Sequence, residues 1–286
     1  MHKYRPSKPP KVKRTPNMSY IKQGTSKEEL DLHKTINLII PGVETVKGDR
    51  TILEGREIDI YIPRYRLGIE YDGLAFHSDN TKDPNYHLWK TVTAEKKGVR
   101  LIHIWSDLWN NRRSQVTDYL SKTLGKYQSI SYEDCAVGEV SKLEGAQFLN
   151  STHILGNNKQ GAHYIGIYYN NYLMQVAEFK EDWTYLQEAS RNSIIIEDGL
   201  HQIFAYIFRT YNIRITKAEI DRSIFDGNDL KLLGFKSTSC SRPNSVWTKD
   251  FKTRKLQENL TDQQLATAGY HRFYDCGVLY MNRALN

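Results

Sequence analysis

The chain has 286 residues, of which 39% are hydrophobic and 26% charged, and its formal net charge is +7. That length suffices for about two domains, and the composition is typical of a globular protein. No apolar run approaches the roughly 20 residues of a membrane-spanning helix, and the N-terminus lacks the apolar core of a secretion signal. We therefore expect a cytoplasmic protein with no membrane partner.

The excess of basic residues is accompanied by 19 tyrosines and 5 tryptophans. Lysine and arginine neutralise phosphates and release counterions, so this balance favours a nucleic-acid partner. Many basic proteins bind no nucleic acid, so the charge alone does not establish such a partner. Three cysteines stand far apart without CxxC spacing and are expected to be reduced thiols rather than a disulfide framework or a zinc site.

Residues 1–24 contain seven basic residues, four prolines and no acid. Such a segment cannot bury enough apolar surface to fold alone, and we predict a flexible basic arm. The arm could follow a DNA backbone through Lys11, Lys13 and Arg14, or serve only as a solubilising tail.

A helix is predicted from Ser26, which with Glu29 forms a capping box, to Pro41-Gly42. Leu30, His33, Ile36 and Ile40 recur at helical spacing. Glu29 is explained as the partner of the cap, and it could also point at a site if the helix packs over the following strands.

Two short apolar runs follow, IDIYIP and LGIEY, joined by Arg64-Tyr65-Arg66. Ile58, Ile60 and Ile62 alternate with Asp59, Tyr61 and Pro63, and this period of two residues predicts a strand. Leu67 to Tyr71 is predicted to be its hairpin partner. The turn Asp72-Gly73 then leads to His77.

Asp59 then lies in the middle of one strand and Glu70 on its neighbour. Buried carboxylates are costly unless they are paired or hold a cation. Two such acids with a histidine nearby suit a divalent-metal site that hydrolyses phosphodiesters. Alternatively, the acids face solvent, with Asp59 paired to Arg56 or Arg64.

The next predicted elements are a helix over 86–97, a central strand over 99–105 and a helix from Ser106 to about Leu124. His87 and Lys90 are three residues apart and share a helix face. Arg112 and Arg113, early in the last helix, either contact phosphate or simply lie at a solvated helix start. These elements complete a small α/β unit over residues 25–127.

Residues 128–138 are predicted to be a linker, or else the first strand of a second unit over 139–286. In that unit we expect helices near 141–153, 199–212 and 228–235. Strands are expected near 163–179, around a tight Asn170-Asn171 turn, and near 184–191, 215–223 and the C-terminus.

The segments EIDIYIP, GIEYDGLAFHS, YHLWKT and GVRLIHIWSDLW occur in this order. Together they resemble phage homing endonucleases related to the very short patch repair endonuclease, a branch of the PD-(D/E)XK superfamily. The resemblance spans residues 25 to about 125. It implies a site-specific endonuclease that cleaves double-stranded DNA with Mg²⁺ or Mn²⁺, encoded by a phage and acting in the host cell.

The resemblance also assigns roles. It makes Asp59 the principal metal ligand, completed by Glu70 or Asp72. His77 would be the general acid or base, and Glu29 would support the site from its helix. His87 and Lys90 would face the scissile phosphate. The motif lysine is missing, because E-x-K reads Glu70-Tyr71-Asp72 here, so His77 or Lys90 would take its role. Further candidate phosphate contacts are Arg64, Arg66, Arg112 and Arg113.

NDLKLLGFK, after a strand near Glu219–Arg222, is similar to the last helix-to-strand element of GNAT acyltransferases. An active acyltransferase needs a glycine-rich turn at a helix start to cradle the CoA pyrophosphate. The corresponding stretch, IIIEDGLHQIF, offers one glycine and two acids. We therefore expect a GNAT-like α/β scaffold that contacts DNA or positions the nuclease.

Three functions remain as hypotheses: a homing-type DNA endonuclease, a DNA-binding protein with an inactive nuclease fold, and an acyltransferase targeted to nucleic acid. The first leads, because the acids and His77 are all present.

Overall fold

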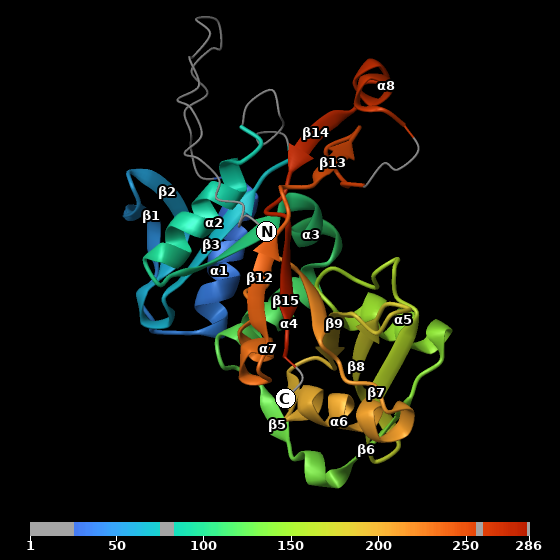
Figure 1. Cartoon of the computed structure of the whole chain (residues 1–286). Helices are drawn as coiled ribbons and strands as arrows, with labels where there is room; N and C mark the ends of the chain where they lie inside the picture. The colour runs from blue at the N-terminus through green and yellow to red at the C-terminus, as the bar shows by residue number, and fades with distance from the viewer. Residues whose placement is uncertain (1–25, 75–82, 256–259, 285–286) are drawn as a thin grey trace, which may run out of the picture.

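A computed structural model describes residues 26–74, 83–255 and 260–284 of the chain. It is a mixed α/β protein with several sheets (Figure 1). Within these ranges, no helix combines the length and apolar character needed to cross a membrane.

The first part of the chain, residues 26–124, is called the N-terminal unit below. Its four-stranded sheet has the order β1-β2-β3-β4, with β3 and β4 parallel and the other pairs antiparallel. The elements are α1 (Lys27–Ile39), β1 (Val46–Leu53), β2 (Arg56–Ile62), β3 (Leu67–Asp72), α2 (Tyr86–Lys96), β4 (Arg100–Trp105), α3 (Ser106–Asn111) and α4 (Arg113–Thr123).

The predicted hairpin is present as β2 and β3, with Ile60 opposite Ile69. A 3-10 turn over Pro63–Tyr65 joins the strands, and Arg66 closes it with a positive φ of 48°. Strand β1 has no predicted counterpart, because its sequence VKGDRTIL lacks an alternating apolar pattern.

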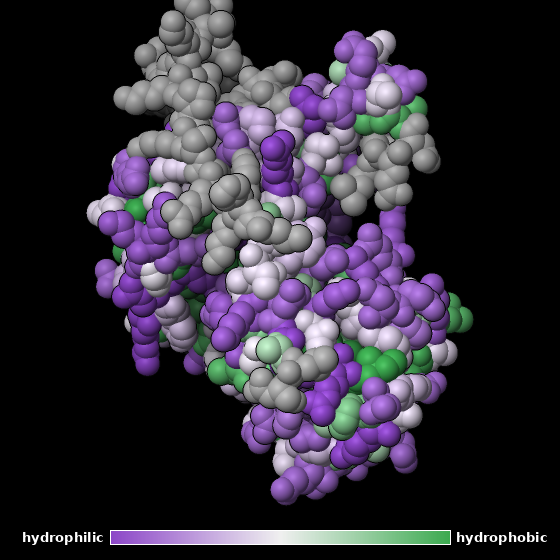
Figure 2. All heavy atoms as spheres, viewed as in Figure 1, coloured by the Kyte–Doolittle hydropathy of each residue, from purple (hydrophilic) through white to green (hydrophobic). Residues whose placement is uncertain are grey.

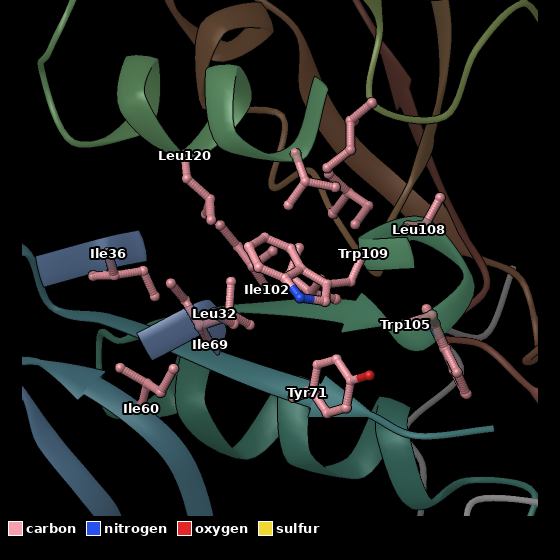
Figure 3. Packing of buried hydrophobic residues seen from close by; sticks show 14 of the residues in the cluster. Leu32, Ile36, Ile60, Ile69, Tyr71, Ile102, Trp105, Leu108, Trp109 and Leu120 are labelled. Carbon is pink, nitrogen blue, oxygen red and sulfur yellow. The ribbon is translucent and has the colours of Figure 1, made fainter. Parts of the chain in front are cut away.

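The core of the N-terminal unit lies between the sheet and the helices α1 and α4. Ile60, Ile69 and Ile102 from three strands pack there, and Trp109 is buried among them (Figure 3). Helix α2 packs against other strand residues, with Ala94 in one cluster with Ile58 and Leu101.

Helix α1 begins at the predicted residue, because the Ser26 hydroxyl accepts a hydrogen bond from the Glu29 amide at 3.0 Å. The return hydrogen bond of a capping box, from the Ser26 amide to the Glu29 carboxylate, is not formed between these described residues. Its inward face differs from the prediction. Leu32 and Ile36 are fully buried, whereas Leu30 is 37% exposed. The apolar positions of this helix are too few to define one stripe from sequence alone.

Strand β4 was predicted to be central but lies at the end of the sheet order. The second part of the chain covers its open edge, where the His103 amide donates a hydrogen bond to the Ser223 carbonyl at 2.8 Å. Burial by a distant segment explains why an edge strand is so apolar.

The helix predicted over 106–124 is interrupted at Arg112, which has φ −135° and ψ 34°. Its guanidinium donates hydrogen bonds to the carbonyls of Asn150, His153 and Ile154, at 2.7 to 2.9 Å. These partners lie in the second part of the chain, so local sequence carries no sign of the break.

The second part, residues 128–284, is called the C-terminal unit. Its main sheet has seven strands in the order β12-β15-β11-β9-β8-β7-β6. The elements are β5 (Gln128–Ile130), β6 (Cys135–Glu139), α5 (Lys142–Thr152), β7 (His163–Tyr169), β8 (Tyr172–Phe179), β9 (Tyr185–Ser190), β10 (Ile194–Ile196), α6 (Gly199–Tyr211), β11 (Lys217–Asp221), α7 (Asn228–Leu232), β12 (Lys236–Cys240), β13 (Ser245–Thr248), α8 (Asp262–Thr267), β14 (His271–Tyr274) and β15 (Val278–Asn282).

Residues 128–138 are not an open linker. Strand β5 pairs in parallel with β10, and β6 forms the edge of the large sheet beside β7. The alternative expectation, the first strand of a second unit, is therefore the one that the structure shows. The tight turn between β7 and β8 is also present, with Asn170 and Asn171 at φ of 50° and 65°.

Residues 241–277 separate β12 from its sheet neighbour β15 and are called the insertion below. They form the two-stranded sheet β13-β14 and helix α8, which project from the rest of the molecule beside α3 (Figure 1).

The two units share one core. Ile154, Ile224 and Phe273 of the C-terminal unit belong to the same buried cluster as Ile102 and Trp109. The boundary near residue 127 is thus a change of sheet and not a separation of two bodies.

Candidate active site

Four charged side chains of the N-terminal unit converge from four elements. They are Glu29 on α1, Asp59 on β2, Glu70 on β3 and Lys90 on α2. Asp59 interacts electrostatically with both Glu29 and Lys90, and Glu70 interacts with both Asp59 and Lys90. We call these four residues the acidic cluster.

Glu70 and Lys90 form a buried ion pair between the Glu70 Oε2 and Lys90 Nζ atoms. The two residues are only 1% and 3% exposed. Buried charges persist when they are paired, and the loss of one partner leaves the other strongly destabilising. The second oxygen, Glu70 Oε1, has no hydrogen-bond partner within the described residues. A buried acceptor of this kind is available to a ligand.

Asp59 has one of its carboxylate oxygens committed to the backbone. The Tyr71 amide donates a hydrogen bond to Asp59 Oδ2 at 2.7 Å, which fixes the carboxylate across the β2–β3 pair. Neither Arg56 nor Arg64 forms an ion pair with Asp59 in the described part of the chain, although the sequence allowed such pairing.

Burial favours the neutral form of all three acids in the cluster. Burial, reinforced by Asp59, raises the pKa of Glu29 to about 7. Burial raises the pKa of Asp59 to about 6, against the opposing influence of Lys90 and the Tyr71 amide. Burial also raises the pKa of Glu70, with Lys90 opposing it. A bound cation would favour the ionised form of all three.

Lys90 is held in its charged form. Burial alone would lower its pKa, but Glu70, Tyr86 and Asp59 together raise it above the usual value. A lysine in this state can stabilise negative charge, and it is a poor general base near neutral pH.

The donor set suits a hard divalent cation, which prefers carboxylate oxygens. Among residues 26–74, 83–255 and 260–284, no group of three or more His, Cys, Asp or Glu side chains is arranged to hold a metal. Asp59, together with the unpartnered oxygen of Glu70, is the described pair that could hold one.

Asp72, the alternative metal ligand suggested by the sequence, interacts electrostatically with Asp59 and Glu70 and also contacts two histidines. Its Oδ2 atom is 2.7 Å from His103 Nδ1, and its Oδ1 atom is 3.4 Å from His87 Nε2. The carboxylate is fully buried between these two histidines. Sequence reasoning missed His103, and the available signal was a polar residue within the apolar strand LIHIW.

His87, which the resemblance expects to face the scissile phosphate, is only 1% exposed. Its Nδ1 atom is 2.8 Å from the Tyr274 carbonyl of the insertion. Burial lowers the pKa of His87, although Asp72 opposes this effect. His87 and Lys90 lie one turn apart on α2, as predicted. The C-terminal unit covers His87 through the contact with Tyr274.

His103 has the opposite electrostatic character. Burial would lower its pKa, but Cys276 and Asp72 raise the pKa well above the usual value. Its Nε2 atom also lies 2.9 Å from the Thr91 hydroxyl, which in turn is 3.3 Å from the Cys276 sulfur. Asp72, His87, His103, Thr91 and Cys276 thus form one buried polar network between the units.

Several candidate residues lie outside the described ranges: Lys11, Lys13, Arg14 and His77. Arg64 and Arg66 lie in the turn between β2 and β3, just before the start of β3. Glu70 and Asp72 lie near the other end of that strand. The Arg66 guanidinium donates hydrogen bonds to the carbonyls of Lys97 and Gly98, at 2.5 and 2.8 Å. It therefore stabilises the chain just after the C-terminal end of α2.

Arg112 and Arg113 have different environments. The Arg112 guanidinium is committed to carbonyls of the C-terminal unit and is not available to a phosphate. Arg113 pairs with Asp31 at 2.5 Å and lies 4.4 Å from the Trp109 ring, with half of its side chain exposed.

No family model matches the chain, and no curated protein sequence does. Among solved structures, the chain is similar to a GNAT family acetyltransferase from Elizabethkingia anophelis with acetyl-CoA bound. The match has 11% sequence identity and covers 54% of this chain and 99% of the other. Its TM-score of 0.27 is too low to establish a shared fold.

Proposed function

We propose that the chain is a metal-dependent, site-specific DNA endonuclease of the homing type. The observation that carries this proposal is the convergence of Asp59, Glu70 and Lys90 on one buried site from β2, β3 and α2. A protein with a purely structural use for these positions would place apolar residues there, because burying several charges is costly.

The lysine of the E-x-K motif is absent from β3, and Lys90 supplies an ammonium group at Glu70 from a helix instead. In the proposed reaction Lys90 stays protonated and stabilises charge that develops on the phosphoryl oxygens. His87 is committed to Asp72 and to the Tyr274 carbonyl, so we assign it to positioning. Proton transfer falls to His77, as the resemblance implies.

Asp59 and Glu70 would hold Mg²⁺ or Mn²⁺, with Glu29 supporting them from α1. The ion would supply a bound water of lowered pKa and offset charge in the transition state. The network around Asp72 would fix α2 against β3 and β4, and thereby keep Lys90 at Glu70.

The N-terminal unit would then be a PD-(D/E)XK-type nuclease domain, and the C-terminal unit a GNAT-like scaffold. An active acyltransferase is the second candidate, and the start of α6 argues against it. Asp198 occupies the N-cap position of this helix in a left-handed conformation, so an acid lies at the helix start where a pyrophosphate would bind.

The test is incubation of the full chain with phage genomic DNA and Mg²⁺, followed by mapping of the DNA ends. We expect discrete ends with the wild-type protein and none with Asp59→Asn. Asp182→Asn removes an exposed carboxylate from the C-terminal unit and should cut normally, which makes it the matched control.

Binding to DNA without cleavage in either Mg²⁺ or Mn²⁺ would support the inactive-nuclease alternative. Stabilisation by acetyl-CoA, with no effect of Asp59→Asn on activity, would support the acyltransferase. Cleavage that survives Asp59→Asn would refute the proposed site.

A further inference from the structure

The insertion of residues 241–277 places a basic turn at the end of the N-terminal sheet, beside α3. Lys249, Lys252 and Lys255 lie on the turn that follows β13, and all three are exposed. None of them forms an ion pair with a carboxylate of the described residues. Hydrophilic side chains predominate on the projecting end of the molecule that carries this turn (Figure 2).

The turn is ordered by its own side chains. Asp250 Oδ1 accepts hydrogen bonds from the Lys252 amide at 2.9 Å and the Thr248 hydroxyl at 3.2 Å. The single acid among the three lysines is therefore used inside the turn. Phe251 adopts a positive φ of 57°, a conformation that costs a non-glycine residue roughly 1–3 kcal/mol and needs support from its surroundings.

That support comes from the N-terminal unit. Phe251 packs against the core shared by the two units, and its ring lies 4.5 Å from that of His271. Asn111 of α3 donates a hydrogen bond to the Lys252 carbonyl at 3.1 Å. The lysines are thus held at a fixed place on the N-terminal unit.

Arg254 strengthens the attachment. Its Nε atom is 3.0 Å from both oxygens of Asp107, and its guanidinium lies 4.3 Å from the Trp105 ring. Trp105 ends β4, and its register partner is Asp72 at the end of β3. The insertion therefore docks at the end of the sheet that carries Asp72, and Tyr274 reaches the nearby His87.

Three lysines that form no ion pair with a described carboxylate repel each other on one short turn, and they gain stability when an anion neutralises them. They lie around a turn whose ends pair at Trp247 and Lys255, so their charges form one patch. The phosphates of a nucleic-acid backbone carry several negative charges and complement such a patch better than one small ion does. A duplex that lies across the acidic cluster would extend along this end of the sheet.

We propose that Lys249, Lys252 and Lys255 form a contact surface for the backbone phosphates of double-stranded DNA. This inference rests on the proposed function, because it takes DNA as the substrate. The contacts are independent of sequence: they add affinity and orient the duplex, and base recognition lies elsewhere.

The test is binding of a fluorescent duplex of arbitrary sequence to the full chain in EDTA, measured by anisotropy at several NaCl concentrations. Each lost phosphate contact reduces the slope of log K against log salt by about 0.9. The triple variant K249Q/K252Q/K255Q should therefore reduce the slope by about 2–3 and weaken binding ~10-fold or more at 100 mM NaCl.

The matched control is K142Q/K159Q/K236Q, which removes the same charge from exposed lysines of the C-terminal unit outside the insertion. It should bind almost as the wild type does. Equal losses in the two triple variants would show that only net charge matters and would overturn the proposal. An unchanged slope in K249Q/K252Q/K255Q, or no binding by the wild type at 50 mM NaCl, would overturn it too.

Because EDTA prevents metal-dependent cleavage, this assay separates the two proposals. Binding through the insertion by a protein that never cuts DNA would leave this inference standing and refute the endonuclease. Cleavage by a protein whose binding ignores these lysines would do the reverse.

Discussion

Lys90 is the only cation paired with Glu70 in the described part of the chain, and both side chains are buried. Lys90→Met should therefore lower the free energy of unfolding by about 3–5 kcal/mol, because it leaves a buried charge uncompensated. The loss should be larger at pH 8 to 9 than at pH 5, since protonation of Glu70 relieves it. Urea denaturation at several pH values measures the effect.

The double variant Glu70→Gln/Lys90→Met is the control for this pair. Removing both charges should recover most of the lost stability. If the single and double variants unfold at the same urea concentration, the two side chains are not energetically coupled.

His153 is a second buried residue with a measurable signature. Burial lowers its pKa to about 3, and its ring stacks on Phe225 with centroids 5.5 Å apart. The unfolded chain takes up a proton near pH 6.5, whereas the folded one does not. The stability from neutral His153 is therefore complete above pH 6.5 and decreases as the pH falls towards 3, by up to about 1.4 kcal/mol per pH unit.

His153→Asn should remove this part of the pH dependence. The difference in unfolding free energy between wild type and variant should shrink steadily from pH 6.5 to 4. The exposed His201 provides the comparison, and His201→Asn should follow the wild-type curve. A constant difference between wild type and His153→Asn would show that His153 takes up its proton over the same pH range in the folded and unfolded protein, which would contradict its lowered pKa.

At the scale of elements, α5 approaches the large sheet through Gly145. A Cβ atom at this position would lie 2.4 Å from Tyr164 Cδ1 and 2.8 Å from Tyr164 Cβ. The Tyr164 hydroxyl lies 2.9 Å from both Asn157 Oδ1 and Glu178 Oε1 and can donate its proton to either, so the ring has little freedom to move.

Gly145→Ala should therefore destabilise the protein by about 1–3 kcal/mol through overpacking, even though alanine favours a helix by up to about 1 kcal/mol. Thermal unfolding followed by circular dichroism measures the change. Gln147→Ala, at an exposed position of the same helix, should leave the melting temperature nearly unchanged. A stabilised Gly145→Ala variant would mean that α5 can shift away from β7.

At the scale of the whole molecule, both units contribute to one hydrophobic core. Hydrogen bonds also join the two units: Arg112 donates to carbonyls of the C-terminal unit, and the edge of β4 pairs with Ser223. We therefore predict one cooperative unfolding transition. Hydrogen exchange measured peptide by peptide in increasing urea should show strands β3 and β8 losing protection together. Earlier loss of protection in either unit would show two separate folding bodies.

Much of the local structure follows from sequence patterns that act over a few residues. The alternation of Ile58, Ile60 and Ile62 predicts β2, and Ser26 predicts the start of α1. The Asn170-Asn171 pair predicts the turn after β7, because asparagine tolerates positive φ. The acids Asp59 and Glu70 are also recognisable as candidate site residues, because charges within apolar strands are costly.

The environment of these residues depends on partners that are distant in the sequence. Asp72 looked like a metal ligand, yet His87 and His103 enclose its carboxylate. Arg112 looked like a helical phosphate contact, yet carbonyls more than 35 residues away bind it and break the helix. Sequence thus determined the strands with a clear apolar pattern, the start of α1 and the charged positions, since these depend on near neighbours. Tertiary structure decided which charge each of them meets, because burial and pairing arise only when separate elements pack together.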